Sequence, residues 1–498
     1  MSISPTLKTP QIWLLNPPFL KKFSRPQRSP AVTKSGTLYF PMWLAYATAV
    51  LERAGYEVTL TDAPAQDLDE GKILALADDL APDLIVLDTS TPSIDHDLEV
   101  AARIRRRLPN SLIVLVGTHV SATPEETLQN GAAIDIIARR EYEETLLELA
   151  NLLKKNKTKP STTDLKKIKG ISFRQEDNII HNPDRPWLEN LDDLPWVSPV
   201  YKKHLCIDDY FNQNAPHPMV TLITSRGCPH KCTFCVYPQT FTGRRLRNRS
   251  IDDIVDEISW TIETFPKLKS IFFEDDSLTN APDRVRSLCK LIISRGLKIE
   301  WVANSRIELD LETMYLMKRA GCRELCVGFE SGNRETLKKI RKGTSFERMF
   351  RFVSEARQAG ILVHGCFMFG LPGETPASIE QTIDLAIRLR PDTAQFYPLM
   401  IYPGTEAYDE YRTRGWITAQ SYRDWLTPTG LHNCVIRTET MTAAELVRSC
   451  DQARRRFYLR PAYIARKLLQ MLQHPKDIKR TCKAAQTFFR HLFLGSQV

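Results

Sequence analysis

Short apolar runs alternate with amphipathic stretches over the first third of this 498-residue chain. Five runs are nearly continuous in Ile, Leu and Val, which is typical of parallel strands buried on both faces. They cover residues 12–15, 58–60, 84–87, 112–116 and 134–137. The stretches between them have helical periodicity; residues 42–54, for example, lie between Pro41 and Gly55. The alternation predicts an α/β domain over residues 1–155, with a doubly wound parallel sheet.

Ligands of doubly wound sheets bind beyond the carboxyl ends of the strands. Polar residues and a glycine follow the apolar runs at these positions. They are Asn16, Asp62, Thr89, Gly117, Thr118, His119 and Glu141. These residues are therefore candidate contacts of a bound cofactor.

A second alternation follows, with six apolar runs at residues 220–224, 270–273, 301–303, 325–329, 362–368 and 394–400. Six strand–helix units predict a partial (β/α) barrel over residues 216–410, with its active site at the carboxyl ends of the strands. Residues 156–215 contain a lysine-rich stretch, a small hairpin and a proline-containing strap, which we interpret as a linker. Residues 411–498 form a basic, helical C-terminal region in this interpretation.

Three cysteines follow the first strand of the predicted barrel, in the spacing C-x3-C-x2-C: Cys228, Cys232 and Cys235. Three thiolates in one loop can hold three irons of a [4Fe-4S] cluster and leave the fourth iron open for chemistry. The alternative is a structural zinc site, but zinc prefers four closed ligands in paired C-x2-C units. The cysteines are thus candidate metal ligands and catalytic residues.

This segment, with Phe234 just before the last cysteine, resembles the signature of the radical S-adenosylmethionine (SAM) superfamily. In that family the open iron chelates the amino and carboxylate groups of SAM, and one electron from the cluster yields a 5'-deoxyadenosyl radical. The resemblance therefore implies that Cys228, Cys232 and Cys235 hold the cluster. It also implies an electron donor of the flavodoxin or ferredoxin type.

A SAM pocket needs carboxylates and hydroxyls for the amine and ribose, a cation for the carboxylate, and glycines near the adenine. Such residues follow the second to fifth strands of the predicted barrel. With Phe234 in the cluster loop, the candidate SAM contacts are Glu274, Asp275, Arg306, Glu330, Ser331, Gly332 and Gly370.

Residues 327–333, 342–344, 367–375 and 402–406 resemble the radical SAM subfamily that carries an N-terminal cobalamin-binding domain. Its members include methyltransferases acting on unactivated carbon, the anaerobic protoporphyrin ester cyclase and enzymes of hopanoid and other lipids. The resemblance implies cobalamin at the first sheet, in contact with the seven strand-end residues given above. However, where the axial histidine motif D-x-H-x-x-G would lie, the chain has Asp62-Ala63-Pro64. Either cobalamin is held without a histidine, or the sheet binds none and only supports the substrate.

We therefore expect a radical SAM enzyme that methylates an unactivated carbon, with a lipid or other hydrophobic molecule as one candidate substrate. Radical cyclisation, rearrangement or carbon–carbon bond formation on a lipid or tetrapyrrole is the alternative. A non-catalytic iron–sulfur sensor is a third, but it would not need the polar groups at the strand ends. Cys322 with Cys326 could hold a second cluster, although barrel-wall cysteines are commoner, and His364 and Cys366 are pocket wall more often than catalytic.

The composition, with 42% apolar and 26% charged residues, is that of a globular protein, and no apolar run reaches the length of a spanning helix. Eleven scattered cysteines favour a reducing, cytoplasmic location. Residues 451–498 contain eleven Lys and Arg against two Asp, a local charge equal to the net +9 of the chain. Interleaved with apolar residues such as Phe488, Phe489 and Phe493, this charge predicts either a helical cap or peripheral contact with the inner face of an anionic membrane. No recognition motif suggests nucleic acid binding.

Overall fold

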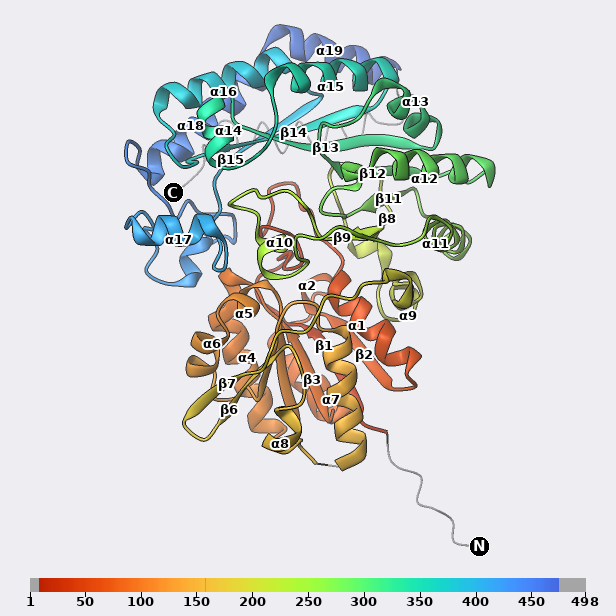
Figure 1. Ribbon diagram of the computed structural model, residues 1–498, viewed down its shortest axis with the longest axis vertical. Coiled ribbons are helices and arrows are strands. Elements are labelled where there is room, and N and C mark those ends of the chain that lie inside the picture. The colour runs from red at the N-terminus through yellow and green to blue at the C-terminus, as the bar shows by residue number, and fades with distance from the viewer. Residues whose placement is uncertain (1–8, 157, 474–498) are drawn as a thin grey trace, which may run out of the picture.

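The computed structural model describes residues 9–156 and 158–473. Two sheets dominate it: a seven-stranded sheet near the N-terminus and a six-stranded parallel sheet in the second half of the chain. Figure 1 shows the first sheet below and the second above. The predicted α/β class is confirmed.

The N-terminal sheet has the strand order β2-β1-β3-β4-β5-β6-β7. The first five strands are parallel, as a doubly wound sheet requires. Their bounds are β1 Gln11–Asn16, β2 Glu57–Asp62, β3 Leu84–Asp88, β4 Leu112–Val116 and β5 Ile136–Ala138. The predicted hairpin, β6 Ile171–Gln175 and β7 Asn178–His181, joins this sheet antiparallel to β5. It therefore extends the N-terminal sheet and is not a separate part of the linker.

Helices cover both faces of the N-terminal sheet and create two cores. Ile12 and Leu14 of β1 belong to one core together with α1 (Met42–Arg53) and α7 (Glu143–Asn156). Trp13 and Leu15 point to the opposite core, with α3 (Glu70–Leu80) and α4 (Ile94–Arg107). The alternation of side chains along a strand explains this division. Short helices follow at the sheet edge: α2 Ala63–Gln66, α5 Thr118–Ala122, α6 Pro124–Asn130 and, after α7, α8 Thr162–Leu165.

The second sheet has the order β15-β14-β13-β12-β11-β8, and all its neighbours are parallel. Its strands are β8 Met219–Leu222, β11 Ser270–Phe273, β12 Glu300–Ser305, β13 Cys322–Glu330, β14 Leu362–Phe369 and β15 Thr393–Pro398. Helices α11 Ile251–Thr264, α12 Pro282–Ser294, α13 Leu311–Arg319, α14 Arg334–Lys339, α15 Phe346–Ala359 and α16 Pro376–Leu389 connect them. Because β8 and β15 are both edge strands, the sheet is a partial barrel, as predicted from the sequence.

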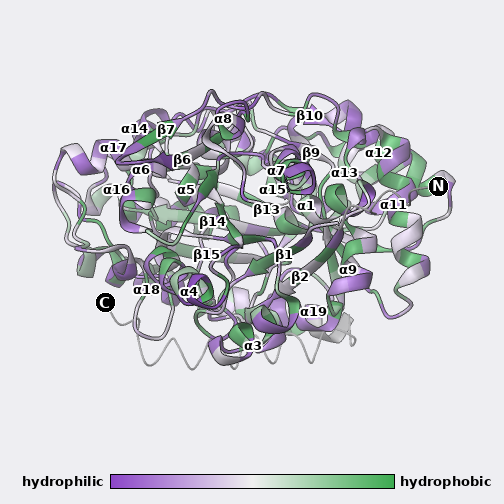
Figure 2. Cartoon of the chain, turned by 90° about the horizontal axis from the view of Figure 1, so that it is seen from below, coloured by the Kyte–Doolittle hydropathy of each residue, from purple (hydrophilic) through white to green (hydrophobic). Residues whose placement is uncertain are grey.

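Short elements complete the middle of the chain. They are α9 Ser198–His204, α10 Val236–Thr240, the two-residue strands β9 Ser225–Arg226 and β10 Arg247–Asn248, and 3-10 turns at Thr91–Ser93, Leu191–Asp193, Ile207–Asp209, Leu278–Asn280 and Tyr422–Trp425. Seen from below, apolar residues gather in the strands and on the inner sides of the helices, whereas polar residues gather outside (Figure 2).

The C-terminal region is helical, with α17 Glu406–Thr413, α18 Ala443–Tyr458 and α19 Pro461–Gln473. In α18, Arg456 pairs with Glu380 and with Asp384 (2.8 Å) of α16. In α19, Arg466 donates to the carbonyl oxygens of Arg390 and Pro391, which precede β15. The helix therefore lies at the amino end of that strand, away from the barrel mouth. Phe488, Phe489 and Phe493 lie outside the described residues, and within the described ranges no helix is long and apolar enough to cross a membrane.

Candidate active site

The cysteine loop leaves β8 at the barrel mouth and folds back on itself. The backbone N–H of Cys228 donates to the Gly243 carbonyl oxygen (3.2 Å), and that of Cys235 donates to Cys232 (3.5 Å). Gly227 has φ +87°, and a Cβ there would lie 2.1 Å from the Arg245 carbonyl oxygen, so the turn requires glycine. Burial raises the pKa of the Cys235 thiol to about 12. A thiolate at this position therefore needs a positive partner, which iron would supply.

A single zinc ion needs its ligands to converge on one point. In residues 9–156 and 158–473, no group of three or more His, Cys, Asp or Glu side chains is placed to hold one ion in this way. In a cubane cluster, each cysteine instead binds a different iron. The loop supplies the three cysteines that a cluster with one open iron requires.

Asp275, predicted as a SAM contact, holds the start of the cysteine loop. Its Oδ1 accepts hydrogen bonds from the Thr224 N–H (3.0 Å), the Thr224 hydroxyl (3.0 Å) and the Ser225 hydroxyl (2.6 Å). Its Oδ2 is buried and has no hydrogen-bond partner in the described part of the chain. This carboxylate therefore positions the loop, and one oxygen remains for a further donor.

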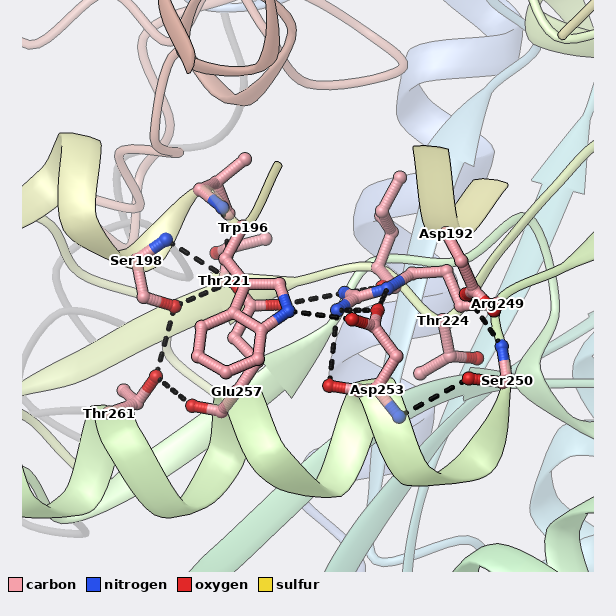
Figure 3. Close-up of polar contacts among 12 residues, drawn as sticks. Asp192, Trp196, Ser198, Thr221, Thr224, Arg249, Ser250, Asp253, Glu257 and Thr261 are labelled. Carbon is pink, nitrogen blue, oxygen red and sulfur yellow. Dashed lines mark hydrogen bonds and ion pairs between the residues drawn. The ribbon is translucent and has the colours of Figure 1, made fainter. Parts of the chain in front are cut away.

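A buried network behind the loop joins the linker strap to the barrel (Figure 3). Arg249 donates to Glu257 (2.6 Å) and Asp253 (2.7 Å) of α11, and its backbone N–H donates to the Thr224 carbonyl oxygen (3.0 Å). The other Glu257 oxygen accepts from the Ser198 hydroxyl (2.7 Å) at the start of α9. Because Glu257 is fully buried and fully paired, the network fixes the strap and the loop together.

A second buried network crosses between the two domains. Arg226, next to the cysteine loop, pairs with Glu143 (2.6 Å) and Glu141 (3.4 Å) of the N-terminal domain. Arg247 binds both oxygens of Glu141, at 2.7 and 2.8 Å. The Arg226 guanidinium also lies 4.9 Å from the Trp43 ring centroid of α1. Glu141, predicted to contact cobalamin, is thus engaged by arginines of the barrel and holds the domains together.

The loop between β1 and α1 rises from the N-terminal domain into the barrel mouth, where its red ribbon lies beside α10 in Figure 1. Its Arg28 pairs with Glu274, a predicted SAM contact, and with Asp276 (3.5 Å). Asn304 of β12 donates to the other Glu274 oxygen (3.2 Å). The Arg28 guanidinium also lies 5.2 Å from the Tyr237 ring centroid. Arg28 was not predicted as a site residue, since no local pattern links it to acids about 250 positions away.

Arg306 follows β12 and Glu330 ends β13, the next two strands of the sheet after β11, which Glu274 follows. Glu330 has φ +65°, a strained value for a non-glycine residue, and it accepts from Lys342 Nζ (2.7 Å). Arg306 donates to the Lys342 carbonyl oxygen (2.8 Å). Strained, charged residues held in this way are typical of ligand-binding sites. Lys342 belongs to residues 342–344, which resemble the cobalamin-type subfamily, but its pairing with Glu330 was not predicted.

Three other predicted SAM contacts hold the mouth loops in place. The Ser331 hydroxyl lies 3.3 Å from Glu374, and the Gly332 N–H donates to the Thr382 hydroxyl (2.8 Å). The Gly370 N–H donates to Glu374 (2.8 Å). Phe234 is half-buried against the core. Their direct contact with SAM stays a prediction.

The strand ends of the N-terminal sheet carry a buried polar cluster. Asp62 accepts from Asn16 (2.7 Å) and from the Tyr210 hydroxyl (2.9 Å). Burial raises the pKa of Asp62 to about 6, although these hydrogen bonds oppose the rise. Arg25 of the β1–α1 loop pairs with Asp97 (2.6 Å), and both side chains are fully buried. The edge is therefore rich in hydrogen-bonding groups.

His119 uses both ring nitrogens within this edge. Nδ1 lies 3.1 Å from the Thr91 hydroxyl, and Nε2 lies 3.2 Å from the Thr123 hydroxyl. Burial lowers the pKa of His119 to about 3, so the ring is neutral. Gly117 has φ +120°, and a Cβ there would lie 2.5 Å from the Thr89 carbonyl oxygen. Position 117 therefore requires glycine, because the end of β3 packs against it, and Thr118 beside it is half-buried.

This edge fits a corrin ring, whose amide side chains need hydrogen-bond donors and acceptors. Asn16, Asp62 and Thr89 are buried and hydrogen-bonded within the protein, and the direct contact of the seven predicted residues with cobalamin stays a prediction. Helix α2, with the sequence Ala63-Pro64-Ala65-Gln66, follows Asp62 directly. Binding of cobalamin without a protein histidine stays a prediction.

Cys322 and Cys326 do not share a site. Four residues of strand span roughly 13 Å. Cys322 lies near Cys289 of α12, whereas Cys326 accepts a hydrogen bond from Asn214 (3.2 Å). A second cluster between them is not supported.

Residues 222–386 match the family model of the Radical SAM superfamily, and residues 28–150 match that of the B12 binding domain. An uncharacterized methyltransferase of Pyrococcus horikoshii is 30% identical over 450 residues, which cover 90% of this chain and 94% of that protein. The anaerobic magnesium-protoporphyrin IX monomethyl ester cyclase of Cereibacter sphaeroides is 27% identical over 85% of this chain and 67% of its own length. The chain therefore belongs to the radical SAM superfamily, in the group that carries a B12-binding domain, and is a radical SAM enzyme.

The fold is similar to that of the radical SAM methyltransferase TsrM from Kitasatospora setae, solved with cobalamin and a [4Fe-4S] cluster bound. The TM-score is 0.65 at 20% sequence identity, over 89% of this chain and 85% of that one. At this identity the likeness concerns the fold. The predicted family and architecture are both confirmed.

Proposed function

We propose that this protein transfers a methyl group to an unactivated carbon, using a [4Fe-4S] cluster, SAM and cobalamin. One observation carries the proposal: the cysteine loop and the edge of the B12-binding domain meet at one interface. Arg28 and Arg226 bridge it through buried or half-buried ion pairs. Two cofactors held on these two surfaces would face a common space.

When bound, the cluster supplies the electron that cleaves SAM, and cobalamin supplies a methyl carrier. The chain's own residues would then have separate tasks. Cys228, Cys232 and Cys235 hold three irons. Glu274 and Glu330 offer carboxylates to the SAM amine, and Arg306 with Lys342 offers positive charge to its carboxylate.

Each turnover breaks one substrate C–H bond and forms one C–CH3 bond. It consumes two SAM and two electrons, and it releases S-adenosylhomocysteine, 5'-deoxyadenosine and methionine. A flavodoxin- or ferredoxin-type protein is the electron donor that we propose. Without methyl transfer, as in radical cyclisation, 5'-deoxyadenosine would form without S-adenosylhomocysteine.

The test is anaerobic reconstitution with iron, sulfide, cobalamin and a strong reductant, followed by quantification of both SAM products. We expect S-adenosylhomocysteine and 5'-deoxyadenosine in the presence of acceptor, and neither iron binding nor 5'-deoxyadenosine after Cys228→Ala, Cys232→Ala or Cys235→Ala. Cys206→Ala, an exposed cysteine outside the loop, is the matched control. Cleavage of SAM by all three loop variants would refute the proposal.

A further inference from the structure

The inner and outer faces of the barrel differ in chemistry along β13, β14 and β15. The register pairs Cys326 with His364 and His364 with Thr393, so these three polar residues form one row on the inner face. Gly328, Cys366 and Gln395 form the next row toward the mouth. The intervening rows belong to the outer face and are apolar. They include Leu325, Val327, Val363, Phe367, Ala394 and Phe396.

The outer face is packed, whereas the inner face is open. Phe367 stacks on Phe396 with ring centroids 5.3 Å apart, and Phe396 contacts Phe457 of α18. On the inner face, Cys326, Cys366 and Tyr397 are only half-buried, and Gln395 is exposed. Because solvent reaches side chains that point into the barrel, a ligand can reach them too.

The groups on this inner face are mainly neutral hydrogen-bonding groups. His364 Nδ1 lies 2.7 Å from the Thr393 hydroxyl, and burial lowers the pKa of His364 to about 4. Burial, the largest effect, and the nearby Cys366, Glu330 and Cys235 raise the pKa of the Tyr397 phenol well above its ordinary value. Both rings are therefore uncharged at neutral pH.

We propose that the methyl acceptor is a water-soluble molecule with several hydrogen-bonding groups, which Gln395 and Tyr397 recognise on this inner face. The inference rests on the proposed function and names the substrate class of that same site. A lipid chain against this face would remove the exposed Gln395 amide and the half-buried Tyr397 hydroxyl from water and offer no hydrogen bond in return. This loss costs about 1–3 kcal/mol for each group. A polar acceptor replaces those bonds. Sites that bind hydrogen-bonding substrates in this way discriminate strongly against apolar ones.

The position of α19 is consistent with this substrate class. Its outward residues Ile464, Leu468 and Leu469 are exposed, at 44%, 56% and 59%. They lie at the amino end of β15, whereas the cluster loop lies at the carboxyl ends of the strands. A membrane bound at α19 would therefore not be presented to the barrel mouth.

The test uses reconstituted full-length enzyme, methyl-deuterated SAM and an extract of the source cells separated into aqueous and chloroform phases. We expect deuterated methyl groups in an aqueous-phase product. Label confined to the chloroform phase would overturn the proposal while leaving methyl transfer intact. Failure to form S-adenosylhomocysteine or 5'-deoxyadenosine with either phase would instead reject the proposed function on which it rests.

Two variants then locate the recognition. Gln395→Leu and Tyr397→Phe should each raise the KM for the purified aqueous acceptor about tenfold, which corresponds to about 1.4 kcal/mol. Gln358→Leu makes the same chemical change on the exposed face of α15 and should leave KM unaltered. Iron content and SAM affinity check that each variant is folded and loaded. Unchanged KM in both inner-face variants would remove the role assigned to them.

Discussion

The two sheets of this protein follow the same strand–helix alternation but use their faces differently. Every residue of β3, β4 and β5 in the N-terminal sheet is buried, because helices cover both faces. In the barrel, β13, β14 and β15 alternate between buried apolar residues and half-buried or polar ones. The N-terminal sheet therefore exposes only its strand ends to ligands, whereas the barrel also exposes part of its inner face, at Cys326, Cys366, Gln395 and Tyr397.

This difference implies that the buried strands mainly determine the stability of the fold, whereas the inner face of the barrel can determine substrate specificity. Fully buried strands tolerate little change, since interiors are close-packed. The open inner face of the barrel contributes less to packing and is free to vary with the substrate. The two sheets should respond very differently to the same chemical change.

The largest contrast is expected from a carboxylate placed in the middle of a strand. Leu115→Asp in β4 buries an unpaired charge and should cost more than about 5 kcal/mol, enough to unfold the domain. Gln395→Glu in β15 places the same group on the exposed inner face and should cost less than about 1 kcal/mol. Chemical denaturation followed by circular dichroism measures both. Similar losses in the two variants would break the comparison.

The interface between the two regions should depend on Arg226. Arg226→Met leaves Glu143 buried without its cation and should cost about 3–5 kcal/mol. Arg245→Met removes an exposed pair with Glu189 (2.6 Å) nearby and should cost about 0–1 kcal/mol. Differential scanning calorimetry would compare them. If Arg226→Met left the melting profile unchanged, the ion pairs of Arg226 would not contribute to the coupling of the two domains.

The edge of the N-terminal sheet should give stability a pH dependence through Asp88. Burial raises its pKa to about 7 in the folded state, against about 3.9 in an unfolded chain. Between these values the folded form holds a proton that the unfolded form releases, so the free energy of unfolding falls as pH rises from 4 to 7 and then levels off. Asp88→Asn should remove this fall and be more stable than wild type at pH 8, by about 1.4 kcal/mol per pKa unit.

Urea titrations at pH 4, 6 and 8 would measure that difference. Asp79→Asn, which alters an exposed acid of α3, is the control and should track the wild type. If the difference in free energy of unfolding between Asp88→Asn and wild type did not grow with pH, the prediction would be wrong.

The smallest effect is expected at the C-terminus, where peripheral membrane contact stays a prediction. Among the described basic residues, Arg456 and Arg466 bind groups of the barrel. Contact with a membrane would therefore depend on residues 474–498. This segment contains five Lys or Arg and one Asp. At about 1 kcal/mol per basic residue, binding to anionic vesicles should be weak and salt-sensitive. Deleting 474–498 should abolish cosedimentation without lowering the melting temperature. Arg456→Ala should lower the melting temperature and leave cosedimentation with vesicles unchanged. If either variant lost cosedimentation and also melted at a lower temperature, the region would be a purely structural cap.

Much of the fold could be predicted because it depends on local patterns. The buried strands around Val86 and Val114 are apolar throughout, and their alternation with helices specifies a parallel sheet. The hairpin around Phe173 was recognised, but its place beside β5 was not, since hairpin sequences do not specify which edge they extend. The cysteine loop was predictable for the same local reason, as its ligands lie within eight residues.

By itself, the sequence determined the α/β fold class and the family, and it predicted Cys228, Cys232 and Cys235 as the cluster ligands. Only the tertiary structure decided which polar residues remain for ligands. In the sequence, Asp275 and Glu141 were strand-end acids like Glu274. In the structure, Asp275 accepts hydrogen bonds from the cysteine loop, and Glu141 is paired with Arg247. Arg28 and Lys342 reach the mouth from distant parts of the chain. The physical reason is that a side chain's chemistry is local, whereas its hydrogen-bond partner is set by long-range packing.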